Sequence, residues 1–245
     1  GEVRARTLTP DESLLDYLRD HGLSRISKRL VSSGALDVVA TAAPGIKDIL
    51  ILGKVKQLER AGDVDLIVLD APAAGHAITF LQAASALLDT VRVGPINAQA
   101  RDVLAMLTDH GRCRVVLVTL PEETPVNELV DTAFNLEDRV GIGLGPVVVN
   151  GLYDDLPGLA TAPAAAAEAA GTTLRAGEDV ALAAAAAFRS DRMALQVEQV
   201  ARLAEQLPLA QIRLPFVFTA EIGPAELDLL ADRLLAEVDG LPEVV

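Results

Sequence analysis

Short apolar runs alternate along the chain with longer stretches in which apolar residues recur every three or four positions. Uninterrupted apolar runs are typical of strands buried on both faces of a parallel sheet, whereas the three-to-four spacing is typical of amphipathic helices. The predicted strands are Val3–Thr7, Val64–Asp70, Arg114–Thr119, Pro146–Asn150 and Ile212–Pro215. The predicted helices are Asp11–His21, Arg25–Ser32, Ile46–Arg60, Ile78–Leu88, Ala98–Asp109, Pro125–Arg139, Asp191–Glu205 and Pro224–Val238.

The order of these elements predicts an α/β fold with a mostly parallel sheet flanked by helices. Thr9 and Pro10 provide the N-cap and first position expected of a helix start, and Gly22 a plausible stop. Residues 159–188 are alanine-rich and predict two short helices with a glycine-containing connection, serving either as packing helices or as a client-binding insert. The alternating glycines at 141–146 precede a strand and predict a loop, not a dinucleotide-binding turn.

Composition and charge limit which size of domain and which partners the sequence is compatible with. The 245 residues suffice for one large α/β domain or two small ones, and 51% of them are hydrophobic. A net charge of −14 disfavours nucleic acid as a partner. The single cysteine excludes an internal disulfide. No run reaches the roughly 18 apolar residues that a membrane-spanning helix needs. The N-terminal residues do not resemble a signal peptide. We expect a cytoplasmic protein, whose start at Gly1 suggests a fragment or processed product.

Asp70 is the first candidate for chemistry. It ends the apolar run 64–70, and an Ala-Pro-Ala-Ala-Gly turn and His76 follow it. Ligands in open α/β sheets bind at the carboxyl ends of strands, where a carboxylate can hold a Mg²⁺-bound water or orient an attacking one. Gly75 lies in a turn whose backbone N–H groups could face a terminal phosphate. The alternative is that Asp70 caps the following turn or helix.

Asn150 ends another predicted strand. Its amide offers a donor and an acceptor to an adenine edge, and the alternative is an Asx turn. The chain contains no Gly-x-x-x-x-Gly-Lys-Ser/Thr segment, so these 245 residues lack the phosphate-binding loop, or P-loop (Walker A), of nucleotide hydrolases.

Five segments, in order, resemble the ArsA-like ATPases, a family that includes the arsenite-pump ATPase and the targeting factor for tail-anchored membrane proteins. LIVLDAPAAGHAITFL resembles their switch II, and APGIKDILILGKVKQLE the helix before it. VVLVTLPEETPVNELVDTA, PVVVNGLY and RLPFVFTAEIG resemble later strands and loops. The resemblance covers roughly residues 1–155 and 195–240, is nearest to the actinobacterial type, and implies one ArsA-like domain over 1–245, incomplete at its N-terminus, with the alanine-rich segment inside it.

The resemblance implies a P-loop sheet that uses ATP and Mg²⁺ and works as a dimer. Asp70 corresponds to the switch II acid near the metal and the hydrolytic water. Gly75 and His76 correspond to the turn that senses the γ-phosphate. The implied nucleotide-base contacts are Asn150, Pro215 and Phe216. Two departures stand out: Ala71 and Ala74 replace the family's threonines, and the phosphate-binding loop is missing.

Three functions remain open at this point. The chain could belong to an ATPase whose phosphate-binding loop lies outside it, with ATP driving dimer closure and handling of an anion or protein client. It could be a non-catalytic partner subunit of a heterodimer, which the two departures favour. A ParA/MinD-type ATPase is disfavoured by the acidic charge and by the lack of a basic C-terminal amphipathic helix. A membrane-protein client is possible. The alanine-rich segment contains no methionine, however, so it is a poor groove for a transmembrane helix.

Overall fold

The structure is a computed structural model that describes residues 2–20, 22 and 45–241, so the predicted helix Arg25–Ser32 lies outside the described residues. The chain forms two compact units. Unit 1 comprises Gly1–Val115 and Thr132–Leu144, and unit 2 comprises Val116–Asp131 and Gly145–Val245. The prediction of one ArsA-like domain over residues 1–245 stays a prediction, because the division into units concerns contacts and not family relationship.

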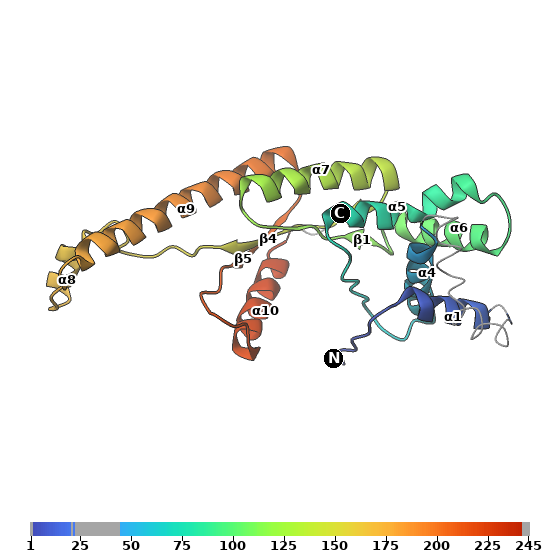
Figure 1. Ribbon diagram of the computed structural model, residues 1–245, viewed down its shortest axis with the longest axis horizontal. Helices are drawn as coiled ribbons and strands as arrows, with labels where there is room; N and C mark the ends of the chain where they lie inside the picture. Colours follow the sequence, from blue (N-terminus) through green and yellow to red (C-terminus); the bar gives the residue numbers. More distant parts are fainter. Residues whose placement is uncertain (1, 21, 23–44, 242–245) are drawn as a thin grey trace. The chain divides into compact units, whose positions relative to one another are not determined.

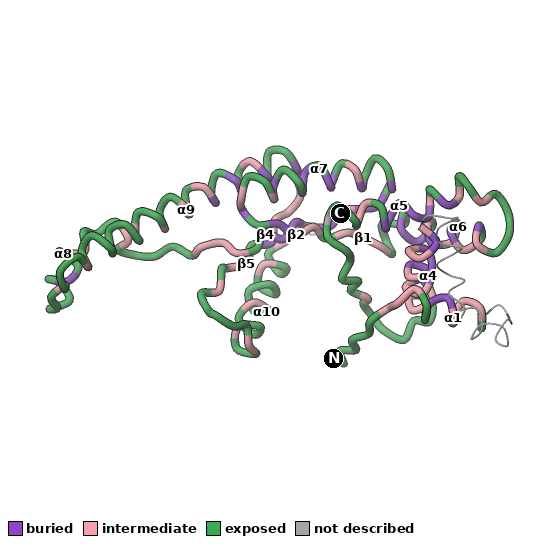
Figure 2. Tube along the Cα trace, in the orientation of Figure 1, coloured by how far each residue is buried: buried purple, intermediate pink, exposed green. Residues whose placement is uncertain are grey.

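Unit 1 is mostly helical. Its helices are α1 (Pro10–Asp20), α4 (Ile46–Ala61), α5 (Ala74–Thr90) and α6 (Pro95–Leu107), followed by the second half of α7 (Glu123–Val140). Helix α4 packs against α1, α5 and α6 (Figure 1). These helices each bury part of their surface (Figure 2), and the largest fully buried side chains are aliphatic, including Ile49, Leu52, Leu87, Val103 and Leu107.

A buried charge ties α4 to α6. Lys56 is only 5% exposed, and its ammonium donates to Gln99 Oε1 at 2.9 Å and to Asp102 Oδ2 at 3.1 Å. Arg60 reaches the same carboxylate oxygen at 3.3 Å from the solvent side. A lysine on an amphipathic helix is ordinarily solvated, but here the α6 carboxylate and amide provide partners that the sequence of one helix does not reveal.

The boundaries of the predicted helices agree with the structure to within a few residues in most cases. At the start of α1 the Thr9 hydroxyl accepts from the Glu12 N–H at 3.3 Å, as an N-cap does. After its end, Gly22 has a φ of 75° and donates to the Arg19 carbonyl. Helix α5 begins four residues earlier than predicted, so Gly75 and His76 belong to its first turn and not to a preceding loop.

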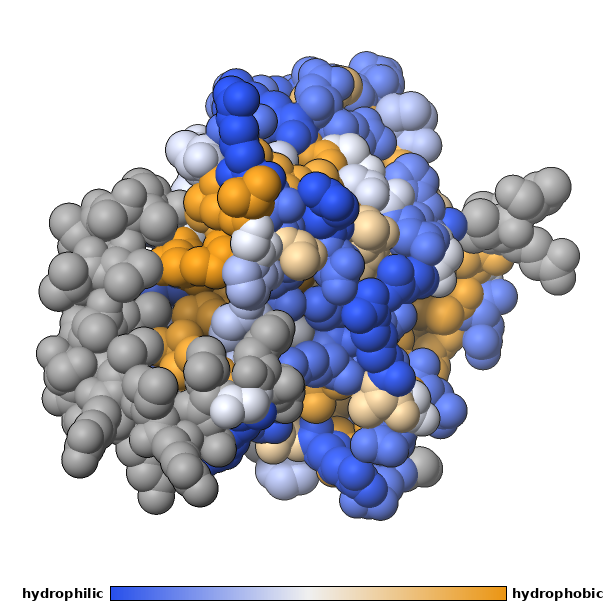
Figure 3. Space-filling view, turned by 90° about the vertical axis from the view of Figure 1, so that its right-hand side faces the viewer, coloured by the Kyte–Doolittle hydropathy of each residue, from blue (hydrophilic) through white to orange (hydrophobic). Residues whose placement is uncertain are grey.

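Two predicted strands were wrong. Neither Val3–Thr7 nor Val64–Asp70 is a strand in the structure, since no described residue forms a ladder with either segment. A strand requires a hydrogen-bonded neighbour, and an apolar run cannot specify one by itself. Leu66 and Val68 are 78% and 83% exposed as a result. Apolar side chains reach the surface among hydrophilic ones in the view of Figure 3.

The predicted strand Arg114–Thr119 is divided. Its first part is β1 (Arg114–Val115), which pairs in parallel with β3 (Gly143–Leu144) in unit 1. Its second part is β2 (Val118–Thr119), which belongs to unit 2. Strand β3 also replaces part of the loop predicted at 141–146.

Unit 2 contains a parallel three-stranded sheet in the order β2-β4-β5, where β4 is Val147–Leu152 and β5 is Gln211–Pro215. Helix α9 (Glu178–Gln206) contacts β4, and α10 (Pro224–Asp239) packs on β5 (Figure 1). The predicted α/β class, with parallel strands flanked by helices, is confirmed. Among the described helices, none combines the length and apolar character that crossing a membrane requires.

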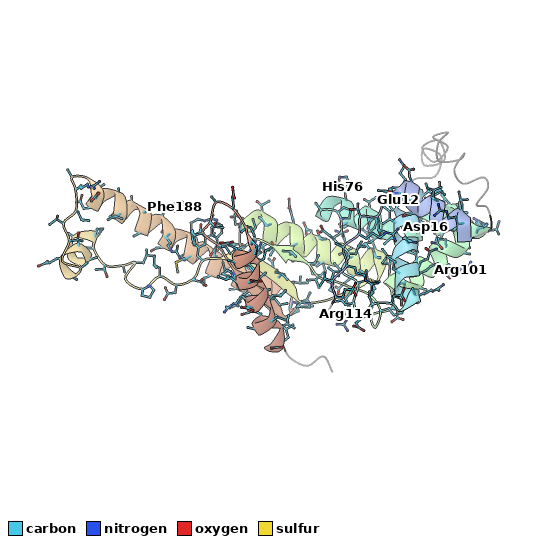
Figure 4. All side chains as sticks on the ribbon, turned by 90° about the horizontal axis from the view of Figure 1, so that it is seen from below. Glu12, Asp16, His76, Arg101, Arg114 and Phe188 are labelled. Carbon is cyan, nitrogen blue, oxygen red and sulfur yellow. The ribbon has the colours of Figure 1, made fainter. Side chains whose placement is uncertain are left out.

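The alanine-rich segment forms α8 (Pro163–Ala169), a glycine-containing connection, and the first part of α9. Two helices were predicted here, but the second runs without a break into the predicted helix Asp191–Glu205 because no glycine or proline interrupts residues 178–206. The 29 residues of α9 span about 43 Å. Much of its first half is exposed, including Phe188 at 64% (Figures 2 and 4).

Candidate functional site

The residues singled out from the sequence fall into the two units. Asp70, Gly75 and His76 belong to unit 1, whereas Asn150, Pro215 and Phe216 belong to unit 2. Each group is therefore described within its own unit.

In unit 1, Asp70 is exposed and lies four residues before α5. The N-cap of α5 is Ala73, and no side chain caps this helix start. The backbone N–H groups of His76 and Ala77 both donate to the Ala73 carbonyl, at 2.8 and 2.9 Å. The proposed capping role of Asp70 is therefore absent from the helix start, and the carboxylate makes no hydrogen bond or ion pair with any described residue.

The first turn of α5 presents polar groups to the surface. Gly75 and His76 are exposed, and Figure 4 shows the His76 side chain at the start of the helix, pointing outward. A helix N-terminus carries unpaired N–H groups and a partial positive charge, so it attracts anions. The turn between Asp70 and His76 thus combines an exposed carboxylate, unpaired among the described residues, with a helix start that lacks a side-chain cap.

In unit 2, a bulge sets the position of Asn150. Strands β4 and β5 pair regularly up to Val149 and again at Leu152, with a register shift between them. Gly151, inside the shift, has a φ of 81°, a left-handed conformation that favours glycine. Asn150 is exposed, and its amide makes no hydrogen bond within the described part of the chain, so the predicted alternative of an Asx turn is not observed.

Pro215 and Phe216 lie beside this bulge. Pro215 is the register partner of Leu152, and the Phe216 N–H donates to the Leu152 carbonyl at 2.7 Å. The structure therefore brings Asn150, Pro215 and Phe216 together at the carboxyl ends of β4 and β5, where ligands of parallel sheets bind.

Sequence reasoning missed an aromatic cluster at the same place. The rings of Tyr153, Phe216 and Phe218 contact one another with centroids 4.6–5.2 Å apart. The Arg189 guanidinium of α9 lies 5.2 Å from the Tyr153 ring centroid and 4.9 Å from that of Phe218, within cation–π range. Phe216 and Phe218 remain 44% and 62% exposed, so the cluster offers ring surface to a ligand.

Two further α9 side chains support this edge of unit 2. Arg192 forms an ion pair with Glu122 at 2.7 Å, and this hydrogen bond raises the pKa of the arginine. Gln196 is 3% exposed and bonds the backbone of Gly151, inside the bulge, and of Tyr153, directly after it. The sequence provides no signal for either contact, because Gln196 lies 43 and 45 positions beyond the backbone groups that it bonds, and Arg192 lies 70 positions beyond Glu122.

A resident metal centre is not evident: no group of three or more His, Cys, Asp or Glu side chains among the described residues could hold an ion. Mg²⁺ in nucleotide sites is commonly held by one or two carboxylates together with water and substrate phosphates, so a single free carboxylate such as Asp70 fits that chemistry.

Comparison with known proteins finds ATPases that are similar to this chain. Residues 20–97 match the family model described as Anion-transporting ATPase. The chain is 31% identical over 157 residues to ATPase BagA of Mycobacterium tuberculosis and to the protein Mb3704 of Mycobacterium bovis, which is also named as an ATPase. The matched region covers 61% of this chain and 46% of each relative, so the chain spans about half the length of the relatives it matches.

Proposed function

We propose that the chain, which is similar to the anion-transporting ATPases over residues 20–97 and to named ATPases over 157 residues, is an ArsA-like ATPase that binds ATP and takes part in its Mg²⁺-dependent hydrolysis. A phosphate-binding loop from outside residues 1–245 would complete the site. Hydrolysis would drive closure of a dimer that handles an anion or a protein client.

The observation that carries this proposal is the combination of a free amide and exposed rings at the carboxyl ends of β4 and β5. Asn150 can pair with the edge of an adenine, since its amide is both donor and acceptor. Phe216 and Phe218 offer faces on which a base can stack, and each stacked base contributes about 1–3 kcal/mol to binding.

The segment 70–76 supports the catalytic half of the proposal. Asp70 would hold Mg²⁺ through a bound water, and the metal would neutralise charge on the phosphates. The exposed N–H groups at the start of α5 would face the terminal phosphate. The carboxylate is free to act because no described residue occupies it.

The test compares two exposed phenylalanines of unit 2 in the full-length protein. Phe216→Ala should raise the Kd for ATP about tenfold, the equivalent of one lost stacking contact. Phe188→Ala is the matched control: Phe188 is 64% exposed on α9 and makes no ring contact with described residues. We expect the control to leave the Kd unchanged. Absence of ATP binding by the unmodified protein, or equal Kd values for all three proteins, would refute the proposed site.

A non-catalytic partner subunit is the second candidate. It is favoured by Ala71 and Ala74, which provide no hydroxyl groups for a water network, and by the absence of a phosphate-binding loop in these 245 residues. A protein of this kind would bind a catalytic subunit and show no phosphate release when purified alone.

We further propose a homodimer or a heterodimer with a related ATPase, and a membrane protein as one possible client. Exposed apolar side chains of unit 2 support an interface with another subunit. They include Val180 and Leu182 on α9 and Leu227 and Leu235 on α10. Cross-linking and light scattering of the full-length protein with and without ATP would test this assembly.

A further inference from the structure

We propose that Gln196 is a positioning residue for nucleotide-base recognition, holding the bulge that presents Asn150 and Tyr153. This inference rests on the proposed function. It assigns a role to a side chain of α9 that is itself too buried to touch the base, being 3% exposed.

Both the nitrogen and the oxygen of the Gln196 side-chain amide form hydrogen bonds with one short backbone segment. Its Nε2 donates to the Gly151 carbonyl at 3.0 Å, and its Oε1 accepts from the Tyr153 N–H at 2.8 Å. These two backbone groups lie on either side of Leu152, directly after Asn150. One side chain thus fixes both ends of a three-residue segment.

The segment needs such support because the sheet does not provide it. The register shift between Val149 and Leu152 removes regular ladder pairing at Asn150 and Gly151. On the β5 side, the Phe216 N–H bonds the Leu152 carbonyl. Gln196 satisfies the neighbouring groups, and an unsatisfied buried backbone group would otherwise favour rearrangement of the bulge.

The position of this segment determines where the Asn150 amide and the Tyr153 ring lie, and both can contact a base. Asn150 precedes Gly151, so a shift of the Gly151 carbonyl moves the Asn150 amide. Tyr153 packs edge-on against Phe216, with centroids 5.2 Å apart and planes at 71°. Loss of the Gln196 bonds should therefore weaken contacts to the base while leaving contacts to phosphates, which other residues make.

The experiment measures how much the base adds to binding. In the full-length protein, Kd values are determined for Mg-ATP and for Mg-tripolyphosphate, which lacks the base and ribose. The variant Gln196→Met keeps the side-chain length and removes both hydrogen bonds. Gln196→Asn keeps the amide on a side chain one methylene shorter, which cannot span both backbone groups, and it serves if Gln196→Met does not fold.

Gln199→Met is the matched control. Gln199 lies on the same helix, is 4% exposed, and its Oε1 has no hydrogen-bond partner among the described residues. Far-UV circular dichroism and urea midpoints of all variants show whether helix content and stability are comparable.

We expect Gln196→Met to lower the ratio of the tripolyphosphate Kd to the ATP Kd about three- to tenfold, the equivalent of one net hydrogen bond. KM for ATP should rise with kcat unchanged, and Gln199→Met should retain the original ratio. An unchanged ratio in a folded Gln196 variant, or an equal fall in Gln199→Met, would overturn this inference alone. If the unmodified protein does not prefer ATP over tripolyphosphate, the proposed function fails and this inference with it.

Discussion

Removal of the Asp102 carboxylate should destabilise unit 1 through the buried ammonium of Lys56. In Asp102→Ala that ammonium keeps Gln99 as a partner but loses the carboxylate with which it forms an ion pair. Breaking a buried ion pair from one side costs about 3–5 kcal/mol. The Asp102 side chain is 45% exposed, so water can replace part of the interaction, and we expect a loss of about 2 kcal/mol in the free energy of unfolding.

A second substitution shows whether the loss of stability comes from the unpaired Lys56 ammonium or from the packing of the Asp102 side chain. Lys56→Met replaces the ammonium by an apolar group of similar length, so Lys56→Met/Asp102→Ala should recover most of the loss and lie within about 1 kcal/mol of the unmodified protein. Glu59→Ala is the control, because the Arg112–Glu59 pair is about one-third exposed on both sides and should contribute no more than about 1 kcal/mol.

Urea unfolding followed by far-UV circular dichroism measures these differences. A double variant as unstable as Asp102→Ala would refute the reasoning, since the deficit would then arise from the loss of the aspartate and not from an unpaired lysine. A loss in Asp102→Ala equal to that in Glu59→Ala would show that Lys56 is effectively solvated.

The same pair predicts a dependence of stability on pH. The hydrogen bond from Lys56 lowers the pKa of Asp102 below its ordinary value of 3.8, outweighing desolvation, which acts in the opposite direction. A carboxyl group whose pKa is lowered by folding stabilises the folded state above its unfolded value and loses this contribution as the pH falls through the folded pKa. Acid destabilisation below about pH 4 should therefore be weaker in Lys56→Met than in the unmodified protein.

Three further outcomes concern function. Asp70→Asn in the full-length protein should keep ATP affinity and lower kcat by at least about tenfold in steady-state phosphate release, because under the proposed function the acid acts on metal and water; an unchanged kcat would exclude that role. Cys113→Ser should leave the response to arsenite unchanged in the same assay, because burial raises the pKa of the thiol and arsenite capture needs thiolates. Stoichiometric binding of arsenite by the unmodified protein that is lost in this variant would contradict the prediction. Deletion of residues 159–188 should not abolish capture of a tail-anchored segment in a high-salt pull-down, because the segment is alanine-rich and lacks methionine; abolished capture would identify it as a client site.

Helices were the predictable part of this fold, for a local reason. The start of α1 follows from Thr9 and Pro10, which act within one turn, and the amphipathic spacing of α7 and α10 persists over several turns. The merging of the alanine-rich segment into α9 was missed because glycine-free alanine sequence is compatible both with short helices and with one long helix.

Strands were less predictable because pairing is not a local property. The apolar runs 147–152 and 211–215 became β4 and β5, which pair with each other. The equally apolar run 64–70 has no paired neighbour among the described residues and leaves Val68 83% exposed. A run of valines and leucines indicates that a segment is compatible with a buried strand. It does not report whether a neighbouring strand is available.

The candidate site shows the same limit at the level of single residues. Asn150 was predicted from its place at the end of an apolar run and Phe216 from the family resemblance, and the structure places both near the carboxyl ends of β4 and β5. Gln196 could not, because it bonds backbone 43 and 45 positions earlier in the chain and occupies an ordinary polar position of a long helix. Residues that touch a ligand lie where topology places strand ends, so sequence can indicate them. The residues that hold those strand ends in position come from whichever helix packs behind them, and only the packed structure identifies them.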